Sequence, residues 1–114
     1  MLDTEWWNAH TTAGDALYMG CPIVTCPGKT FASRACGSIL NALGMSELIC
    51  KDVKEYEEKV VKLCTTPGAL KKLRQKTIEK VKTSDVFKTE KFTRSFEKAC
   101  KEMFEESLDE LNKL

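Results

Sequence analysis

The chain has 114 residues, a length that suits one domain with a buried core and is too short for an enzyme built from two lobes. Its net charge of +1 argues against nucleic acid or an anionic membrane as the main partner, and no apolar run approaches the length of a membrane span. Six charged residues lie in residues 1–50, and the other 29 follow Cys50. We therefore predict a single domain over 1–114, with a mostly buried strand-and-helix unit over 1–50 and a helical tail over 51–114.

The first half alternates predicted helices with short apolar runs. A helix is predicted over 11–19, where Gly20 and Pro22 act as stop signals. The β-branched run 22–26 predicts a buried parallel strand. Thr30 is expected to cap a helix over 31–43, and residues 47–50 are expected to form a second short strand. This alternation predicts an α/β fold that is mostly helical, with two to three short parallel strands and five helices.

The second half predicts three helices. Asp52 and Glu55 have the spacing of a capping box, and Thr66 is expected to cap the next helix with Pro67 in its first turn. The last helix is predicted over 89–111 and carries a broad apolar stripe, for which a core-facing helix is the favoured interpretation. The stripe consists of Phe92, Phe96, Ala99, Cys100, Met103, Phe104, Leu108 and Leu111.

A polar turn before the first helix is the strongest candidate for a binding site. His10, Thr11 and Thr12 stand where backbone N–H groups have no partner within the helix and the dipole favours negative charge, so the turn suits a diphosphate. Asp15 follows Thr12 by three residues and lies on the same helix face, where a carboxylate can accept hydrogen bonds from ribose hydroxyls. The alternative is an ordinary helix start, with Thr11 or Thr12 as the cap and Asp15 complementing the dipole.

Two other patterns suggest chemistry but lack the required partners. Residues 27–30 follow a predicted strand and precede a helix, as in a phosphate-binding P-loop, but Ile23 stands where that loop needs its first glycine. His10 has no Ser or Cys partner in a recognisable motif for nucleophilic catalysis. We therefore assign no catalytic residue from the sequence.

The cysteines indicate a reducing compartment. They are scattered through apolar positions, form no Cys-x-x-Cys pair and accompany a single histidine, so we expect neither disulfides nor a metal site. Reduced thiols that pack as small apolar groups place the protein in the cytoplasm or the nucleus. The six are Cys21, Cys26, Cys36, Cys50, Cys64 and Cys100.

One long motif carries a family resemblance, and its residues are His10, Thr11, Thr12, Asp15, Leu17, Gly20, Pro22, Val24, Thr25, Pro27 and Gly28. Its order and spacing resemble the donor-binding segment of the protein O-linked N-acetylglucosamine transferases, which are two-lobed glycosyltransferases of the B type. The similarity continues through Thr30, Ala32-Ser33-Arg34, Leu43-Gly44, Glu47-Leu48-Ile49 and Glu55-Tyr56-Glu57, and then more faintly to Phe87. It therefore covers nearly the whole chain.

The resemblance implies a C-terminal fragment of the Rossmann-like lobe that binds the sugar nucleotide. In that reading His10, Thr11 and Thr12 face the diphosphate of UDP-N-acetylglucosamine and Asp15 holds the ribose, without a metal or other cofactor. The sequence departs from the family pattern within the turn, where Ala9 replaces a glycine and Ala13-Gly14 replaces a Gly-Met pair. Ala9 fits only if its position does not need a positive φ.

The implied reaction is transfer of N-acetylglucosamine to Ser or Thr hydroxyls of intracellular proteins, with the acceptor-binding lobe outside this chain. We expect the fragment alone to be inactive. Two alternatives remain open: a Spindly-type protein O-fucosyltransferase that uses GDP-fucose, against which His10 argues, and a non-catalytic helical interaction module. C-terminal helices of B-type enzymes often return to the other lobe, so a bare stripe on the last helix would favour self-association.

Overall fold

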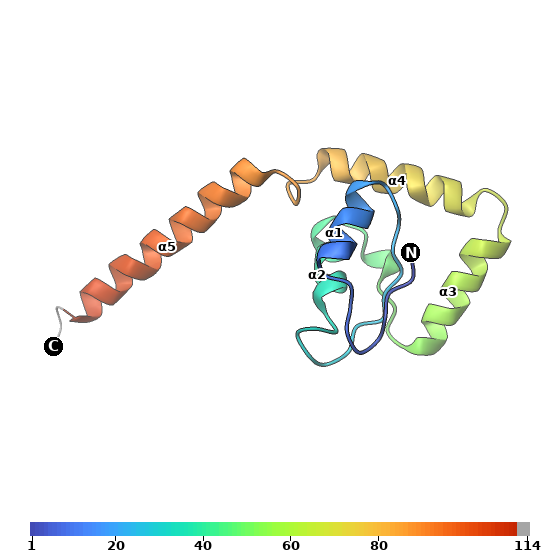
Figure 1. The fold of residues 1–114 in the computed structure, drawn as a ribbon, viewed down its shortest axis with the longest axis horizontal. Helices are drawn as coiled ribbons and strands as arrows, with labels where there is room; N and C mark the ends of the chain where they lie inside the picture. Colours follow the sequence, from blue (N-terminus) through green and yellow to red (C-terminus); the bar gives the residue numbers. More distant parts are fainter. Residues whose placement is uncertain (112–114) are drawn as a thin grey trace. The chain divides into compact units, whose positions relative to one another are not determined.

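The computed structural model describes residues 1–111 and divides into two compact units, one from Met1 to Ser84 and one that begins at Asp85. The described elements are α1 (Thr11–Tyr18), α2 (Ala35–Ala42), the 3₁₀ helix η1 (Ser46–Leu48), α3 (Val53–Thr65), α4 (Ala69–Thr83) and α5 (Thr89–Leu111) (Figure 1). Within the first unit, α1 contacts α2 and α4, α3 contacts α4, and α2 contacts η1.

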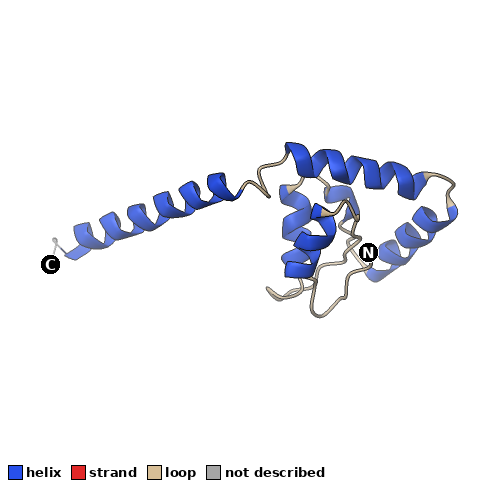
Figure 2. Cartoon of the chain, turned by 45° about the horizontal axis from the view of Figure 1, so that its top comes forward, coloured by secondary structure: helices blue, strands red, loops and turns tan. Residues whose placement is uncertain are grey.

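The prediction of an α/β fold with two to three parallel strands is wrong, because residues 1–111 contain no strand (Figure 2). The extended segments meet only in isolated parallel bridges, Leu2 with Val24 and Thr25 with Ile49. Pro22 and Pro27 bracket the middle segment, and a proline has no N–H with which to extend a ladder. The pairing therefore stays too short to form the Rossmann-like sheet that the resemblance implied.

Glycines end the first two helices as the sequence predicts. Gly20 has φ +73° and Gly44 has φ +67°, the left-handed conformation that closes a helix end at low cost. The start of α2 differs from the prediction, since the helix begins at Ala35 rather than near residue 31. Thr30 is not its cap; the Thr30 and Ser33 hydroxyls bond each other at 3.0 Å and close a separate turn.

The Asp52 cap of α3 is confirmed, with Glu55 bonded to the residue before the cap, whereas the predicted cap of α4 is wrong. The Asp52 carboxylate accepts from the Glu55 amide at 2.8 Å, and the Glu55 carboxylate accepts from the Lys51 amide at 2.9 Å. Gly68, with φ +75°, is the N-cap of α4, while Thr66 is the C-cap of α3. The residue before a proline avoids helical geometry, which explains why Thr66 ends α3 before Pro67.

The core of the first unit is built from residues 13–50, as the scarcity of charge there indicates. Thr77 of α4 is also fully buried, and its hydroxyl bonds the Leu73 carbonyl at 2.9 Å. The buried apolar side chains are Ala13, Leu17, Ile23, Val24, Cys36, Leu40, Leu43, Met45, Leu48 and Cys50.

The second unit consists of a short turn and α5. Hydrogen bonds from Lys91 and Lys88 lower the pKa of the Asp85 carboxyl to about 2 and fix the turn that precedes the helix. Every α5 side chain whose exposure is described is exposed, so the prediction of a core-facing stripe is wrong for this unit. No helix within residues 1–111 is long and apolar enough to cross a membrane.

Candidate functional site

Helix α1 begins at Thr11, where the sequence places it, with His10 as the N-cap. The His10 carbonyl accepts from the Ala13 amide at 3.1 Å and the Gly14 amide at 3.2 Å. Neither threonine is the cap. Among the described residues none accepts a hydrogen bond from the amides or hydroxyls of Thr11 and Thr12, and both side chains are exposed. The first turn thus offers free donors to a ligand.

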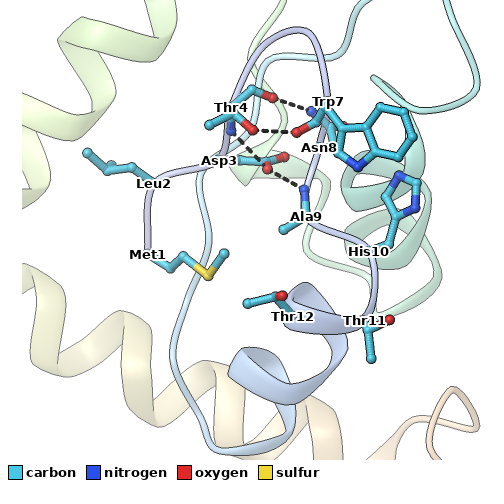
Figure 3. A pocket seen from close by; sticks show the side chains of 10 residues that line it. All are labelled: Met1, Leu2, Asp3, Thr4, Trp7, Asn8, Ala9, His10, Thr11 and Thr12. Carbon is cyan, nitrogen blue, oxygen red and sulfur yellow. Dashed lines mark hydrogen bonds between the residues drawn. The ribbon is translucent and has the colours of Figure 1, made fainter.

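A pocket of about 350 Å³ opens at this helix start (Figure 3). It brings together His10, Thr11 and Thr12, whereas Asp15 does not line it. Asp15 is exposed one turn further along the same helix. None of the ten lining residues is Lys or Arg, and the helix start adds partial positive charge at this pocket. The lining residues are Met1, Leu2, Asp3, Thr4, Trp7, Asn8, Ala9, His10, Thr11 and Thr12.

The His10 ring is held by three neighbours. Its Nε2 lies 3.2 Å from the Ala32 carbonyl oxygen, so Nε2 carries the hydrogen of that bond. The ring stacks on Trp7 at a centroid distance of 5.6 Å and meets the edge of Phe31 at 5.9 Å. In this tautomer the neutral ring has only an acceptor left at Nδ1. His10 can donate to a phosphate only as the imidazolium or after releasing Ala32.

Asp3 organises the loop that leads to the site, and sequence analysis did not single it out. Its Oδ1 accepts from the Thr4 amide at 3.0 Å and the Ala9 amide at 2.7 Å, and its Oδ2 accepts from the Thr25 hydroxyl at 2.6 Å. Ala9 fits here because no non-glycine residue in the described chain has a positive φ. The partners of the Asp3 side chain lie up to 22 residues away, so no local sequence motif predicts this role.

Further bonds fix the same loop. The Tyr56 hydroxyl of α3 donates to the Asp3 carbonyl at 3.0 Å, and burial together with the Asp3 charge raises the pKa of Tyr56. The backbone N–H of Asn8 donates to the Ala32 carbonyl at 2.8 Å, and the Asn8 side-chain Nδ2 donates to the Thr4 carbonyl at 2.7 Å. These bonds hold the loop before α1 at both of its ends. They therefore fix where the helix begins.

Three cysteines of the first unit are not activated as nucleophiles. Burial, with the Asp3 charge second, raises the pKa of the Cys36 thiol to about 12, and burial also raises the pKa of Cys26 and Cys50. Thiols with raised pKa values stay protonated and unreactive. All six cysteines are free, and the described residues contain no group of His, Cys, Asp and Glu that could hold a metal ion.

Known proteins similar to this chain carry the names of glycosyltransferases. A "UDP-N-acetylglucosamine--peptide N-acetylglucosaminyltransferase" of Caenorhabditis elegans is 36% identical over 90% of the chain and 9% of its own length. A barley protein named "Probable UDP-N-acetylglucosamine--peptide N-acetylglucosaminyltransferase SPINDLY" is 34% identical over 95% of the chain and 11% of its own length. A mutant O-GlcNAc transferase of Thermobaculum terrenum matches in structure with a TM-score of 0.76 and 34% identity, over 90% of the chain and 20% of that protein.

These similarities place the chain in one class of proteins, the glycosyltransferases. The profile of glycosyl transferase family 41 matches residues 1–96, and the chain belongs to that family. The chain spans about a tenth of the length of the curated relatives.

Proposed function

We propose that this chain supplies donor-diphosphate and ribose contacts to a glycosyltransferase that moves N-acetylglucosamine from UDP-N-acetylglucosamine to Ser or Thr hydroxyls of proteins. The observation that carries the proposal is the start of α1, where the free amides and hydroxyls of Thr11 and Thr12 line an open pocket. The membership of the chain in family 41 and the names of its relatives support the same donor.

The proposed division of work follows from geometry. The Thr11 and Thr12 donors bind the diphosphate oxygens and stabilise the charge that grows as the sugar leaves. Asp15 lies one turn later, on the solvent side of α1, and accepts from the ribose hydroxyls. The Asp15 contact orients the donor without taking part in the chemistry. Six free cysteines agree with a cytoplasmic or nuclear protein.

Because no Lys or Arg lines the pocket, we expect the pocket to bind a diphosphate only weakly. A diphosphate carries more negative charge than one helix start balances, because the dipole amounts to about half a unit charge. The remaining positive charge and the acceptor site therefore have to come from other parts of the enzyme. We expect the 114-residue chain to bind UDP weakly and to transfer no sugar.

A titration of the chain with UDP, followed by amide resonances in a nitrogen–proton NMR spectrum, tests the site. Shifts are expected at Thr11 and Thr12. The start of α3 is a matched internal control, because Asp52 already occupies its Glu55 amide. Equal shifts at both helix starts, or none at α1 at millimolar UDP, would contradict the proposed site.

The donor base needs a separate experiment, since relatives of both the C. elegans and the SPINDLY type match the chain closely. The longer enzyme is titrated with UDP and with GDP. Tighter binding of UDP supports the N-acetylglucosamine donor, and tighter binding of GDP favours the O-fucosyltransferase reading.

In the same longer enzyme, Asp15→Ala should weaken donor binding about tenfold, the loss typical of a charge-assisted hydrogen bond. Unchanged donor affinity would favour the interaction module instead.

A further inference from the structure

Helix α5 presents an unpartnered apolar face along its whole length. Phe92, Phe96, Met103, Phe104 and Leu111 are each 59–67% exposed. Soluble proteins rarely expose so many large apolar side chains on one helix unless that surface binds a partner. We call this face the α5 stripe, and it comprises Phe92, Phe96, Ala99, Cys100, Met103, Phe104, Leu108 and Leu111.

The spacing of the stripe is that of a helix that pairs with another helix. Phe92, Phe96, Ala99 and Met103 follow one another at intervals of four, three and four residues, as core positions of a coiled coil do. α5 has 23 residues and is uninterrupted (Figure 1), so the stripe from Phe92 to Leu111 is about 28 Å long.

Charge on α5 is divided sharply between its two halves. Residues 89–101 hold four basic and two acidic side chains, whereas residues 102–111 hold five acidic and no basic side chains. This order opposes the helix dipole, which favours acidic residues at the N-terminus and basic residues at the C-terminus. An isolated α5 therefore carries an unfavourable charge distribution that a partner of opposite order would relieve.

We propose that α5 pairs with α5 of a second copy of this chain, in antiparallel orientation. An antiparallel pair places the basic half of each helix beside the acidic half of the other, while a parallel pair places like charges together. The same operation covers the stripe with its own copy, giving a closed two-fold dimer. The midpoint between Phe92 and Leu111 falls between Lys101 and Glu102, so the two-fold axis passes there.

The stripe is tested by measuring the mass of the full chain by sedimentation equilibrium at about 100 µM, well above the Kd of a micromolar dimer. The unchanged chain is expected to be a dimer and Phe96→Glu a monomer. Val61→Glu on α3 is the matched control, because Val61 and Phe96 are both 59% exposed. The control should remain a dimer. A monomeric unchanged chain, or a dimeric Phe96→Glu variant, would overturn the proposal.

The dependence of dimerisation on salt concentration distinguishes the antiparallel orientation from the parallel one. Raising NaCl from about 0.05 to 0.5 M screens the charges, so it should weaken an antiparallel dimer and strengthen a parallel one. Tighter association in high salt would therefore refute the antiparallel arrangement.

Charge reversal gives an independent check that does not depend on salt. Glu102→Lys, Glu105→Lys and Glu106→Lys together give both halves of the helix a net positive charge and should weaken self-association at least tenfold. Lys91→Glu, Lys98→Glu and Lys101→Glu together make it acidic and should do the same. Mixing the two triple variants should restore a dimer, which a variant that merely unfolded would not do. Failure to form the mixed dimer would count against the proposal.

Discussion

At the scale of single residues, Gly20 shows how one missing atom sets the packing of α1 against α4. Gly20 has φ +73°, and a Cβ added there would lie 2.5 Å from Cγ1 of Ile78 in α4. Gly20→Ala should therefore lower the free energy of unfolding by about 2 kcal/mol, from backbone strain and displacement of Ile78. Urea denaturation measures the change.

The control for this prediction is Gly14 in the middle of α1. A Cβ at Gly14 meets nothing within 4 Å, so Gly14→Ala should raise the free energy of unfolding by about 0.5 to 1 kcal/mol through helix propensity. If both substitutions shift stability in the same direction, close packing at Gly20 is not the cause.

The thiols give a second prediction at this scale. Because the pKa of Cys36 is raised from 9.0 to about 12, the folded state keeps its thiol proton more tightly than the unfolded state does. The stability that this contributes is full below pH 9 and is lost as the pH rises toward 12. Iodoacetamide at pH 9 should label the exposed Cys64 rapidly and leave Cys36 unlabelled until urea unfolds the chain. Early labelling of Cys36, seen by peptide mass spectrometry, would contradict its burial.

The candidate site was predictable in part from residues that act locally. His10, Thr11 and Thr12 could be placed because a helix start is coded by a few neighbouring residues. Asp3 and Tyr56 could not, since their bond joins residues 53 positions apart and depends on how α3 packs. The ring contacts of His10 with Trp7 and Phe31 likewise require the folded loop.

At the scale of elements, helices with local stop and start signals were predicted well, and strands were not. The sequence placed α1 to within a residue and α5 over its observed range, because glycine stops and apolar periodicity are local signals. The apolar runs at 22–26 and 47–50 resembled strands, but a strand exists only when a neighbour pairs along its length. Prolines and the turn η1 limit that pairing to single bridges.

Helix α3 depends on its capping box, which yields a prediction for this scale. Asp52→Ala removes the acceptor of the Glu55 amide and should lower the free energy of unfolding by about 1 kcal/mol. Asp109→Ala is the control, since Asp109 lies near the C-terminal end of α5, where an acidic side chain is unfavourable. Thermal denaturation followed by circular dichroism compares the two. A larger loss for Asp109→Ala would contradict the role of the cap.

At the scale of the whole molecule, the buried apolar side chains belong to the first unit, whereas α5 in the second unit exposes its apolar face. The buried apolar side chains lie within residues 13–50, whereas the largest helix buries none of its described side chains. An isolated helix of 23 residues is marginal in water, because only packing of its apolar face adds substantial stability. The stability of α5 should therefore depend on association rather than on the core of the first unit.

A chain that ends at Lys88 tests this separation, because it removes α5 and leaves the first unit intact. Its free energy of unfolding by urea should equal that of the full chain to within about 0.5 kcal/mol, since α5 contributes nothing to the core. Helicity per residue of the full chain should rise with protein concentration, as expected where α5 folds on pairing, and that of the shortened chain should not. A shortened chain that loses cooperative unfolding would show instead that α5 stabilises the first unit, and concentration-independent helicity in both chains would show that α5 folds without a partner.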